Sequence, residues 1–572
     1  MRGISDRAVC PAAAALVAAL AVAVPAGAAR SAVPARPDNR TIVHVLNRLG
    51  FGPAPGDMAR VRQIGLARYI DEQLQPERLA DVGMAPRLTG LSTLTKSTRE
   101  LADQYFLPAA MERRRAQQQA ANDRAMAGVT SDGTERPAAR TPEQTAAVQA
   151  ERDVFAELAQ QKVLRAVYSE RQLDEVMVDF WFNHFNVFAG KGETRLYLTE
   201  YERDTIRPHV FGKFRDLLGA VAESPAMLFY LDNWQSAAPD GSVIAAPAGR
   251  TPARNMGRPG VLGRRRAVPV VTSRSRPAGA LPQAMSNRRS RGLNENYARE
   301  LMELHTLGVD GGYTQKDVQE VARAFTGWTI ATPGQGGPFR FEPRMHDDGE
   351  KIVLGHRIKA GGGRKDAEQV LDILAEHPAT ARFIAAKLAR RFVADQPPAS
   401  VVDRAAARFR QTHGDIREVV RTIVTSPEFF APASYRAKVK SPLELVASAM
   451  RATSAEAVNA QPLVQALRDL GMPSYQCQPP TGYPDRAEAW VNTGALLNRM
   501  NFAVALAGGR LRGIRILSAE PGGAGVVSAS DVFVDQILAG DLSEATRSIV
   551  GRATQPSQAL ALLLGSPEFQ RR

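Results

Sequence analysis

The stretch NENYARELMELH, residues 294–305, carries polar side chains at a spacing that could do chemistry. Asn296, Glu300 and Glu303 recur at i, i+4 and i+7, so on a helix they fall on one face. Two carboxylates one turn apart can point at one spot, as a divalent-cation site or a general acid–base pair requires. The competing interpretation is a solvated face whose carboxylates pair with arginines such as Arg299.

Two histidines are candidates for acid–base work beside these carboxylates. His184 falls on the apolar face of the helix containing DFWFNHFNVF, and His305 ends the helix of residues 294–305. A buried histidine usually satisfies its ring with a carbonyl or a carboxylate, and a histidine at a helix end complements the helix dipole. The catalytic hypothesis makes Glu300 or Glu303 the general base and His184 or His305 the acid or orienting group, against an ordinary structural role.

Several other chemistries lack their usual motifs. HExxH, GxSxG, Walker A, CxxCH and a GxGxxG after a strand are absent, so we expect no zinc protease, common serine hydrolase, haem or nucleotide cofactor. Cys10 and Cys477 are the two cysteines, and Cys10 lies in the leader. A disulfide within the mature chain and a multi-cysteine metal site are therefore excluded.

Residues 1–28 have the pattern of a signal peptide. Arg2 and Arg7 supply positive charge, an alanine-rich apolar run follows, and Ala26-Gly27-Ala28 fits a cleavage site. We expect export, with the mature protein periplasmic or secreted. No later stretch approaches the ~20 uninterrupted apolar residues of a membrane span, so none is predicted in the mature chain.

The net charge of +14 is concentrated in one segment. Between Gly241 and Asn294 the chain has eleven arginines, no lysine and no acid, and subtracting these eleven leaves +3 for the rest. The segment 236–291 is rich in Pro, Gly, Ser and Arg without periodicity, which predicts a disordered insertion. It is either a solvated loop or an arm that docks on an anionic envelope polymer. Few aromatic residues interleave the arginines, so nucleic acid is an unlikely partner.

The remaining pattern predicts a mainly α fold. A chain of 572 residues is too long for one typical compact core. Capping boxes at Ser169 to Gln172 and Thr314 to Asp317 predict helix starts. A small β-hairpin is predicted from Phe339 and Phe341 to residues 352–354, as the one convincing strand pair. The predicted parts are an N-terminal helical part 41–235 with a long helical hairpin near 92–168, the insertion 236–291, a central region 292–360, and a C-terminal helical part 366–572.

Several motifs resemble the bacterial domain of unknown function 1800 family. They are RLGFGPAPGD, FWFNHFNVF, YLDN, the stretch from GLNENYARELMELHTLGVDGGYTQKD to AFTGWT, MHDDGEKIVLG and QPPTGYPDRAEAWVNTGALLNRMNF. The similarity runs from about His44 to the C-terminal SPEFQRR. The resemblance implies an exported, mostly helical envelope protein, often encoded beside a second exported protein, and it carries over no catalytic residue.

The polar residues of these motifs suggest a shared cleft. Three hypotheses follow: a cleft that binds an extracellular ligand, through a divalent cation held by Glu300, Glu303 and Asp232; a hydrolase-like enzyme acting on an envelope polymer; and a non-catalytic scaffold for a co-exported partner. The residues predicted to bind the ligand are Asn183, Asp232, Asn233, Asn294, Asn296 and His346.

Overall fold

The computed structural model describes residues 32–126, 141–239, 292–516 and 526–572. The predicted signal peptide, residues 1–28, lies outside these ranges, as does the predicted insertion 236–291 apart from its first four residues. Of those four, Ser236, Ala237 and Ala238 are buried.

The described chain is mainly α-helical, as the sequence predicts. Most helices are amphipathic: in α17 (Ile416–Val424) apolar residues recur every three or four positions and are buried. In the first half the helices are α1 (Asn39–Arg48), α2 (Asp57–Ile64), α3 (Leu66–Gln73), α4 (Met84–Leu88), α5 (Thr98–Leu101), α6 (Leu107–Met126), α7 (Pro142–Tyr168), α8 (Gln172–His184), α9 (Thr194–Glu200), α10 (Phe214–Glu223) and α11 (Pro225–Tyr230).

Helices continue through the second half, and their apolar faces join those of the first half in one continuous core. They are α12 (Glu295–Glu300), α13 (Gln315–Ala324), α14 (Lys365–Glu376), α15 (Pro378–Phe392), α16 (Ala399–Gln411), α17, α18 (Pro442–Ala452), α19 (Gln461–Asp469), α20 (Thr493–Ala507), α21 (Val526–Ile537), α22 (Glu544–Val550), α23 (Pro556–Gly565) and α24 (Pro567–Gln570). Short 3-10 turns are η1 (Pro76–Arg78), η2 (Ser92–Thr95), η5 (Arg207–His209), η6 (Asn233–Gln235), η8 (Pro343–Met345), η9 (Pro432–Ser434) and η10 (Ala487–Ala489).

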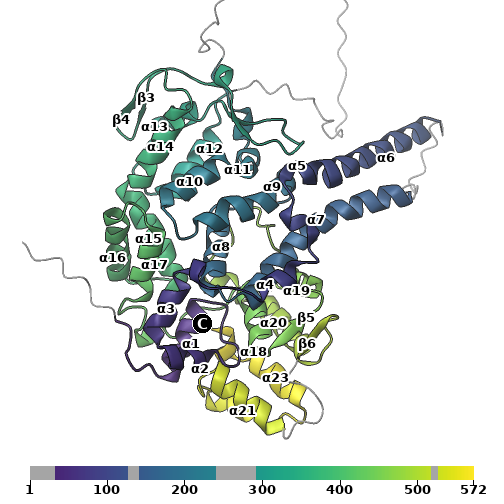
Figure 1. Cartoon of the computed structure of the whole chain (residues 1–572), viewed down its shortest axis with the longest axis vertical. Helices are drawn as coiled ribbons and strands as arrows, with labels where there is room; N and C mark the ends of the chain where they lie inside the picture. Colours follow the sequence, from purple (N-terminus) through teal and green to yellow (C-terminus); the bar gives the residue numbers. More distant parts are fainter. Residues whose placement is uncertain (1–31, 127–140, 240–291, 517–525) are drawn as a thin grey trace, which may run out of the picture.

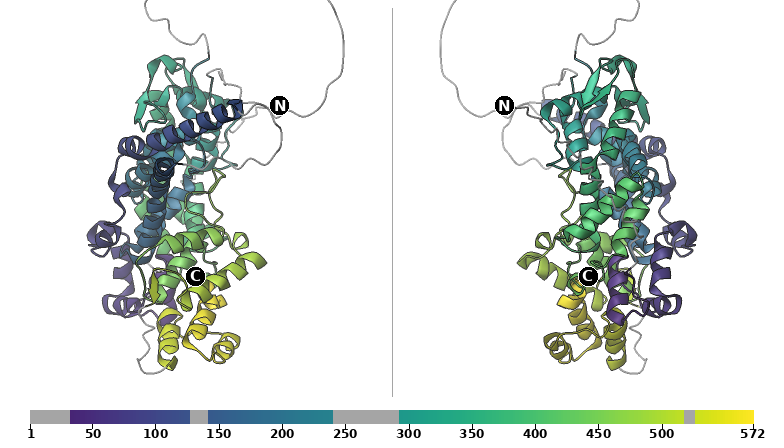
Figure 2. Two further views of the ribbon diagram at one scale, coloured as in Figure 1. Left: turned by 90° about the vertical axis from the view of Figure 1, so that its right-hand side faces the viewer. Right: turned by 90° about the vertical axis from the view of Figure 1, so that its left-hand side faces the viewer.

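The first and last parts of the chain lie together at one end of an elongated body (Figure 1, Figure 2). Asp57 of α2 forms an ion pair of 2.9 Å with Arg451 of α18. Arg40 of α1 forms one of 2.8 Å with Asp541, which lies beyond α21. The helices α10 to α14 occupy the opposite end (Figure 1). The predicted N-terminal and C-terminal helical parts therefore share a single core.

The predicted helical hairpin is formed by α6 and α7, which pack along each other and project from the body as an arm (Figure 1). Thr141 caps α7 in a capping box with Gln144. The predicted loop, residues 128–140, lies outside the described residues.

The strands of the described residues form three two-stranded antiparallel sheets, which corrects the prediction of a single hairpin. Phe339–Phe341 (β2) pairs with Trp328–Ile330 (β1), and Lys351–Val353 (β3) pairs with His356–Ile358 (β4). The predicted pairing of residues 339–341 with residues 352–354 is thus wrong. Between β3 and β4, Leu354 and Gly355 both have positive φ, as a tight two-residue hairpin turn requires. The third sheet joins β5 (Ala455–Ala457) to β6 (Ile514–Ile516).

Three π-helical turns interrupt the α-helical spacing: η3 (Ala102–Phe106), η4 (Tyr201–Ile206) and η7 (Leu301–Thr306). Such turns are rare and recur at functional sites. The turn η7 follows α12 directly. The α-helical spacing that predicted one face for Asn296, Glu300 and Glu303 therefore ends at Glu300. None of the described helices combines the length and apolar character that crossing a membrane needs.

Candidate functional site

The carboxylates of the predicted stripe remain free of arginine partners. Glu300 is half-buried and forms no hydrogen bond or ion pair with any described residue. Burial raises the pKa of Glu300, and the negative charge of Glu303 raises it further. Glu303 accepts a hydrogen bond of 3.0 Å from the Tyr313 hydroxyl. Arg299, the expected partner, donates instead to Gln315. The two glutamates therefore lie close together at the surface.

His184 and His305 come together inside the core. His184 Nε2 lies 3.1 Å from the His305 carbonyl oxygen, and its Nδ1 lies 2.7 Å from the Lys387 ammonium. An ammonium can only donate, so Nδ1 accepts and Nε2–H donates to the carbonyl. Burial, followed by the charge of Lys387, lowers the pKa of His305 to about 3 and that of His184 well below its ordinary range. Both rings are neutral, and the His184 ring connects the His305 carbonyl to Lys387.

Lys387 is a titratable partner that sequence reasoning missed. It lies on α15, and its ammonium sits 5.5 Å above the Phe383 ring. Burial, helped by Arg390, lowers the pKa of Lys387 to about 8. Because 203 positions separate it from His184, no helical spacing could have signalled the pair.

The amides of the FNHFN motif hold a distant loop. Asn183 donates to the Tyr483 carbonyl (2.8 Å) and accepts from the Tyr483 amide (2.7 Å). Asn186 donates to the carbonyls of Cys477 and Pro479 at 2.9 and 2.8 Å. These bonds fix the QPPTGYPD segment against the end of α8, so Asn183 is occupied by the protein's own backbone.

Two more predicted ligand-binding residues have similar structural roles. The Asn233 side chain is 1% exposed and donates to two carbonyls, those of Phe325 and Trp328, both at 3.2 Å. Asn294 caps α12 by accepting from the Tyr297 amide, and it donates to the Leu231 carbonyl at 2.7 Å. Each of these two amides therefore connects segments that are far apart in the sequence.

The last three predicted residues have three different environments. Asp232, with φ of 60°, forms an ion pair of 2.7 Å with Lys191. Asn296 is exposed. His346 is buried, and its Nε2 lies 3.2 Å from the Asp366 carboxylate.

Asp366 completes a buried polar network with His346. Its carboxylate also accepts from the Lys351 ammonium at 2.6 Å, and both side chains are fully buried. Burial opposes ionisation of Asp366, but the hydrogen bonds from His346 and Lys351 outweigh it and lower the pKa of Asp366. Through Lys351 and Asp366, the network connects β3 to α14.

Most of the predicted residues therefore have partners within the protein. Within the described parts of the chain, no three His, Cys, Asp or Glu side chains lie together as a metal site needs. Asp232 consequently does not join Glu300 and Glu303 as the third ligand.

An open groove lies elsewhere, between α7 and α19, with a volume of about 680 Å³. That volume falls within the usual range of ligand sites. Its polar lining consists mostly of amides and guanidinium groups: Gln149, Gln160, Asn459, Gln461, Gln476, Arg152, Arg195 and Arg468, with Asp153 as the one acid among the lining residues.

The groove is cationic because its arginines are unpaired. Arg152, Arg195 and Arg468 form no ion pair with any described residue, and Asp153 accepts from Gln149 at 2.8 Å. The Arg195 guanidinium lies 5.1 Å from the centre of the Phe155 ring. The groove thus offers charged donors, side-chain amides and an aromatic ring on one open surface. No sequence motif marked these residues, because they come from α7, α9 and the segment 459–476.

The fold and groove define a mainly α-helical protein in which most of the predicted polar residues pair within the protein, with an open cationic groove elsewhere on its surface. The chain belongs to DUF1800, a family described as a protein of unknown function, whose model matches residues 44–571. This match confirms the resemblance seen in the motifs. No curated protein and no solved structure matches the chain.

Proposed function

We propose that the chain is an exported, non-catalytic protein that binds a segment of an acidic polysaccharide in the groove between α7 and α19. The observation that carries the proposal is the set of three unpaired arginines, Arg152, Arg195 and Arg468, around one groove. The pattern of residues 1–28 supports export. The co-exported partner that the resemblance implies remains a prediction.

The chemistry of the groove suits a carbohydrate that carries carboxylates. Guanidinium groups pair with carboxylates through two parallel hydrogen bonds. Side-chain amides such as Gln160 and Gln461 donate and accept at once, as sugar hydroxyls require. Phe155 adds an apolar ring face. Because the groove is open to solvent, a polymer chain can continue beyond it.

The same groove argues against hydrolysis at this place. Glycoside hydrolysis uses two carboxyl groups on either side of the scissile bond. The lining has only Asp153, which Gln149 already engages. His184 and His305, the predicted acid or orienting groups, are buried in the core. Binding without cleavage is therefore the function that the groove supports best.

Calorimetric titration with an oligogalacturonate tests the proposal. We expect binding that weakens as salt rises, and a loss of about tenfold in affinity for Arg152→Gln and for Arg468→Gln, from the usual worth of a charged hydrogen bond. Arg552→Gln, an exposed arginine beyond α22, is the matched control and should bind as the wild type does. Equal affinity in all variants, or equal binding of a neutral maltooligosaccharide, would contradict the proposal.

A further inference from the structure

A buried cationic cluster lies where the two ends of the described chain meet. Its only buried carboxylate is Glu444, and two more acids, Asp395 and Asp485, are partly exposed. Six cations therefore face three acids. The cationic cluster consists of Arg48, Arg391, Lys438, Lys440, Arg499 and Arg572, each less than 9% exposed.

The three acids form ion pairs with only three of the six cations. Glu444 pairs with Arg391 and, at 2.9 Å, with Arg572 Nε. Lys438 takes both partly exposed acids, Asp395 at 2.6 Å and Asp485 at 2.9 Å. The other three cations have no carboxylate partner among the described residues.

Two of those three donate to neutral oxygen atoms, although Arg48 Nε and Nη1 have no partner among the described residues. Arg48 Nη2 donates to the Ser434 carbonyl at 2.7 Å, and Arg499 donates to Gln570 and to the Lys440 carbonyl. The Lys440 ammonium is different. It forms no hydrogen bond or ion pair with any described residue and lies 3.9 Å from the centre of the Phe569 ring.

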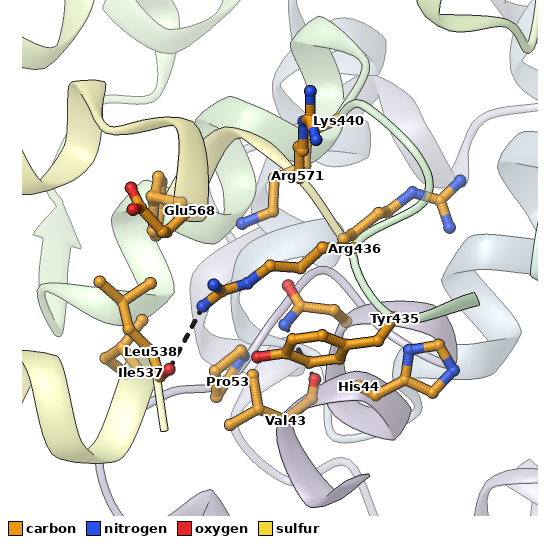
Figure 3. Close-up of a pocket in the computed structure, with 13 residues that line it drawn as sticks. Val43, His44, Pro53, Tyr435, Arg436, Lys440, Ile537, Leu538, Glu568 and Arg571 are labelled. Atoms are coloured by element: carbon orange, nitrogen blue, oxygen red, sulfur yellow. Dashed lines mark hydrogen bonds between the residues drawn. The ribbon is translucent and has the colours of Figure 1, made fainter. Parts of the chain in front are cut away.

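Lys440 lines a narrow pocket together with further donors (Figure 3). The pocket also contacts Arg436, Arg571, Arg572 and Tyr435. Arg572 is 2% exposed, and its Nη2 has no partner among the described residues. Arg436 is already engaged, since it donates to the Leu538 carbonyl and to Asp541.

The pocket also has acceptors, and their places limit what can bind. Glu568 is held by the Ser543 amide at 3.0 Å and by Thr546. His44 is neutral because burial lowers its pKa to about 3, and its Nε2 donates to the Phe429 carbonyl. Its Nδ1 and the Asn47 Oδ1 have no partner among the described residues. A bound water could use these acceptors, so water alone is the competing occupant.

We propose that the pocket binds one small inorganic anion of the size of chloride beside the Lys440 ammonium and the Arg572 guanidinium. Burial lowers the pKa of Lys440 to about 7, because an ammonium without a partner is costly there. A bound anion favours the charged form and offsets that cost. The pocket volume of about 10 Å³ is close to the room that one water-sized particle needs, which excludes sulfate and larger anions. The anion would join α1, the segment before α18 and the end of the described chain.

Thermal unfolding in chloride tests the anion site. Tm is measured from low to high sodium chloride, with sodium gluconate keeping the ionic strength constant. An anion that binds only the folded state raises Tm with its concentration, and we expect a rise of about 2–4 °C. Lys440→Met keeps the length of the side chain without its charge, and it should lose the chloride dependence. Lys316→Met, an exposed lysine on α13, is the matched control and should keep it.

A measurement on the wild type covers the case in which Lys440→Met fails to fold. In a crystal soaked in sodium bromide, we expect an anomalous peak within hydrogen-bond distance of Lys440 Nζ. An absent peak, or a Tm that does not respond to chloride, would mean that the pocket holds water only. A response that survives in a folded Lys440→Met variant would also overturn the proposal.

Discussion

An asparagine side chain carries a donor and an acceptor side by side, so it can pair with backbone as a neighbouring strand would. Asn183 uses both groups on Tyr483, and Asn233 and Asn294 each donate to carbonyls of other segments. These amides were predicted to contact a ligand because Asn is seldom needed for solubility. The same property suits them to hold buried backbone, which the sequence alone could not distinguish.

We expect Asn183→Ala to lower the free energy of unfolding by about 2–3 kcal/mol. The change removes two hydrogen bonds and leaves the Tyr483 amide and carbonyl unsatisfied in a partly buried place. Asn296→Ala is the control, because its side chain is exposed; it should stay within about 0.5 kcal/mol of the wild type in urea denaturation. Similar losses in both variants would refute the structural role of Asn183.

For Glu300 we expect a stability that depends on pH in a defined direction. Its pKa is raised in the folded protein, by burial and by Glu303. The folded state therefore holds a proton that the unfolded state has lost, and stability falls as pH rises above 4.5 towards the folded pKa. Glu300→Gln should remove this part of the pH dependence in thermal unfolding. Glu303→Gln should lower the Glu300 pKa in an NMR titration. An unchanged titration would show that the two carboxylates do not interact.

Among the helices and strands, the sequence predicts correctly those features that contacts between neighbouring residues determine. The capping box of Thr314 and Asp317 starts α13 as expected. The box expected at Ser169 does not form, because α8 begins only at Gln172. The Ser169 hydroxyl instead accepts from the Arg171 amide and donates to Asp81, 88 positions away. The hairpin prediction failed for another reason: the strand of Phe339 and Phe341 pairs with β1, which precedes it, and the sequence did not reveal the strand character of β1.

The loop that follows α19 offers a test of element packing. Gly482 has φ of +74°, and a Cβ there would lie 2.2 Å from the Asn183 carbonyl oxygen. Gly482→Ala should therefore cost about 3 kcal/mol or more. Gly471 also has positive φ but open space around it, so Gly471→Ala should cost only about 1–2 kcal/mol. Equal costs in chemical denaturation would show that the loop is not held against α8.

At the scale of the whole molecule, the sequence predicted the helical class but not which parts meet. The groove, the pair of His184 with Lys387 and the cationic cluster all join residues hundreds of positions apart. Helical periodicity carries no information about such contacts. The predicted parts 41–235 and 366–572 share one core because apolar faces, rather than sequence order, decide packing.

We expect deletion of residues 241–290 to leave the fold intact. The Ala237 amide donates to the Gly292 carbonyl at 3.3 Å, so the flanking positions already lie side by side. A short Gly-Ser linker can bridge them, and Tm should change by less than about 2 °C. A longer deletion that also removes the buried Ala237 and Ala238 should lower Tm. Loss of soluble protein after the shorter deletion would contradict this expectation.

We expect the ligand to bind in the groove between α7 and α19 and not around the residues singled out in the sequence. Hydrogen–deuterium exchange with and without an oligogalacturonate tests this most directly. We predict added protection in residues 149–160 and 459–476. Protection confined to the surface of Glu300 and Glu303, or no protection at all, would contradict the claim.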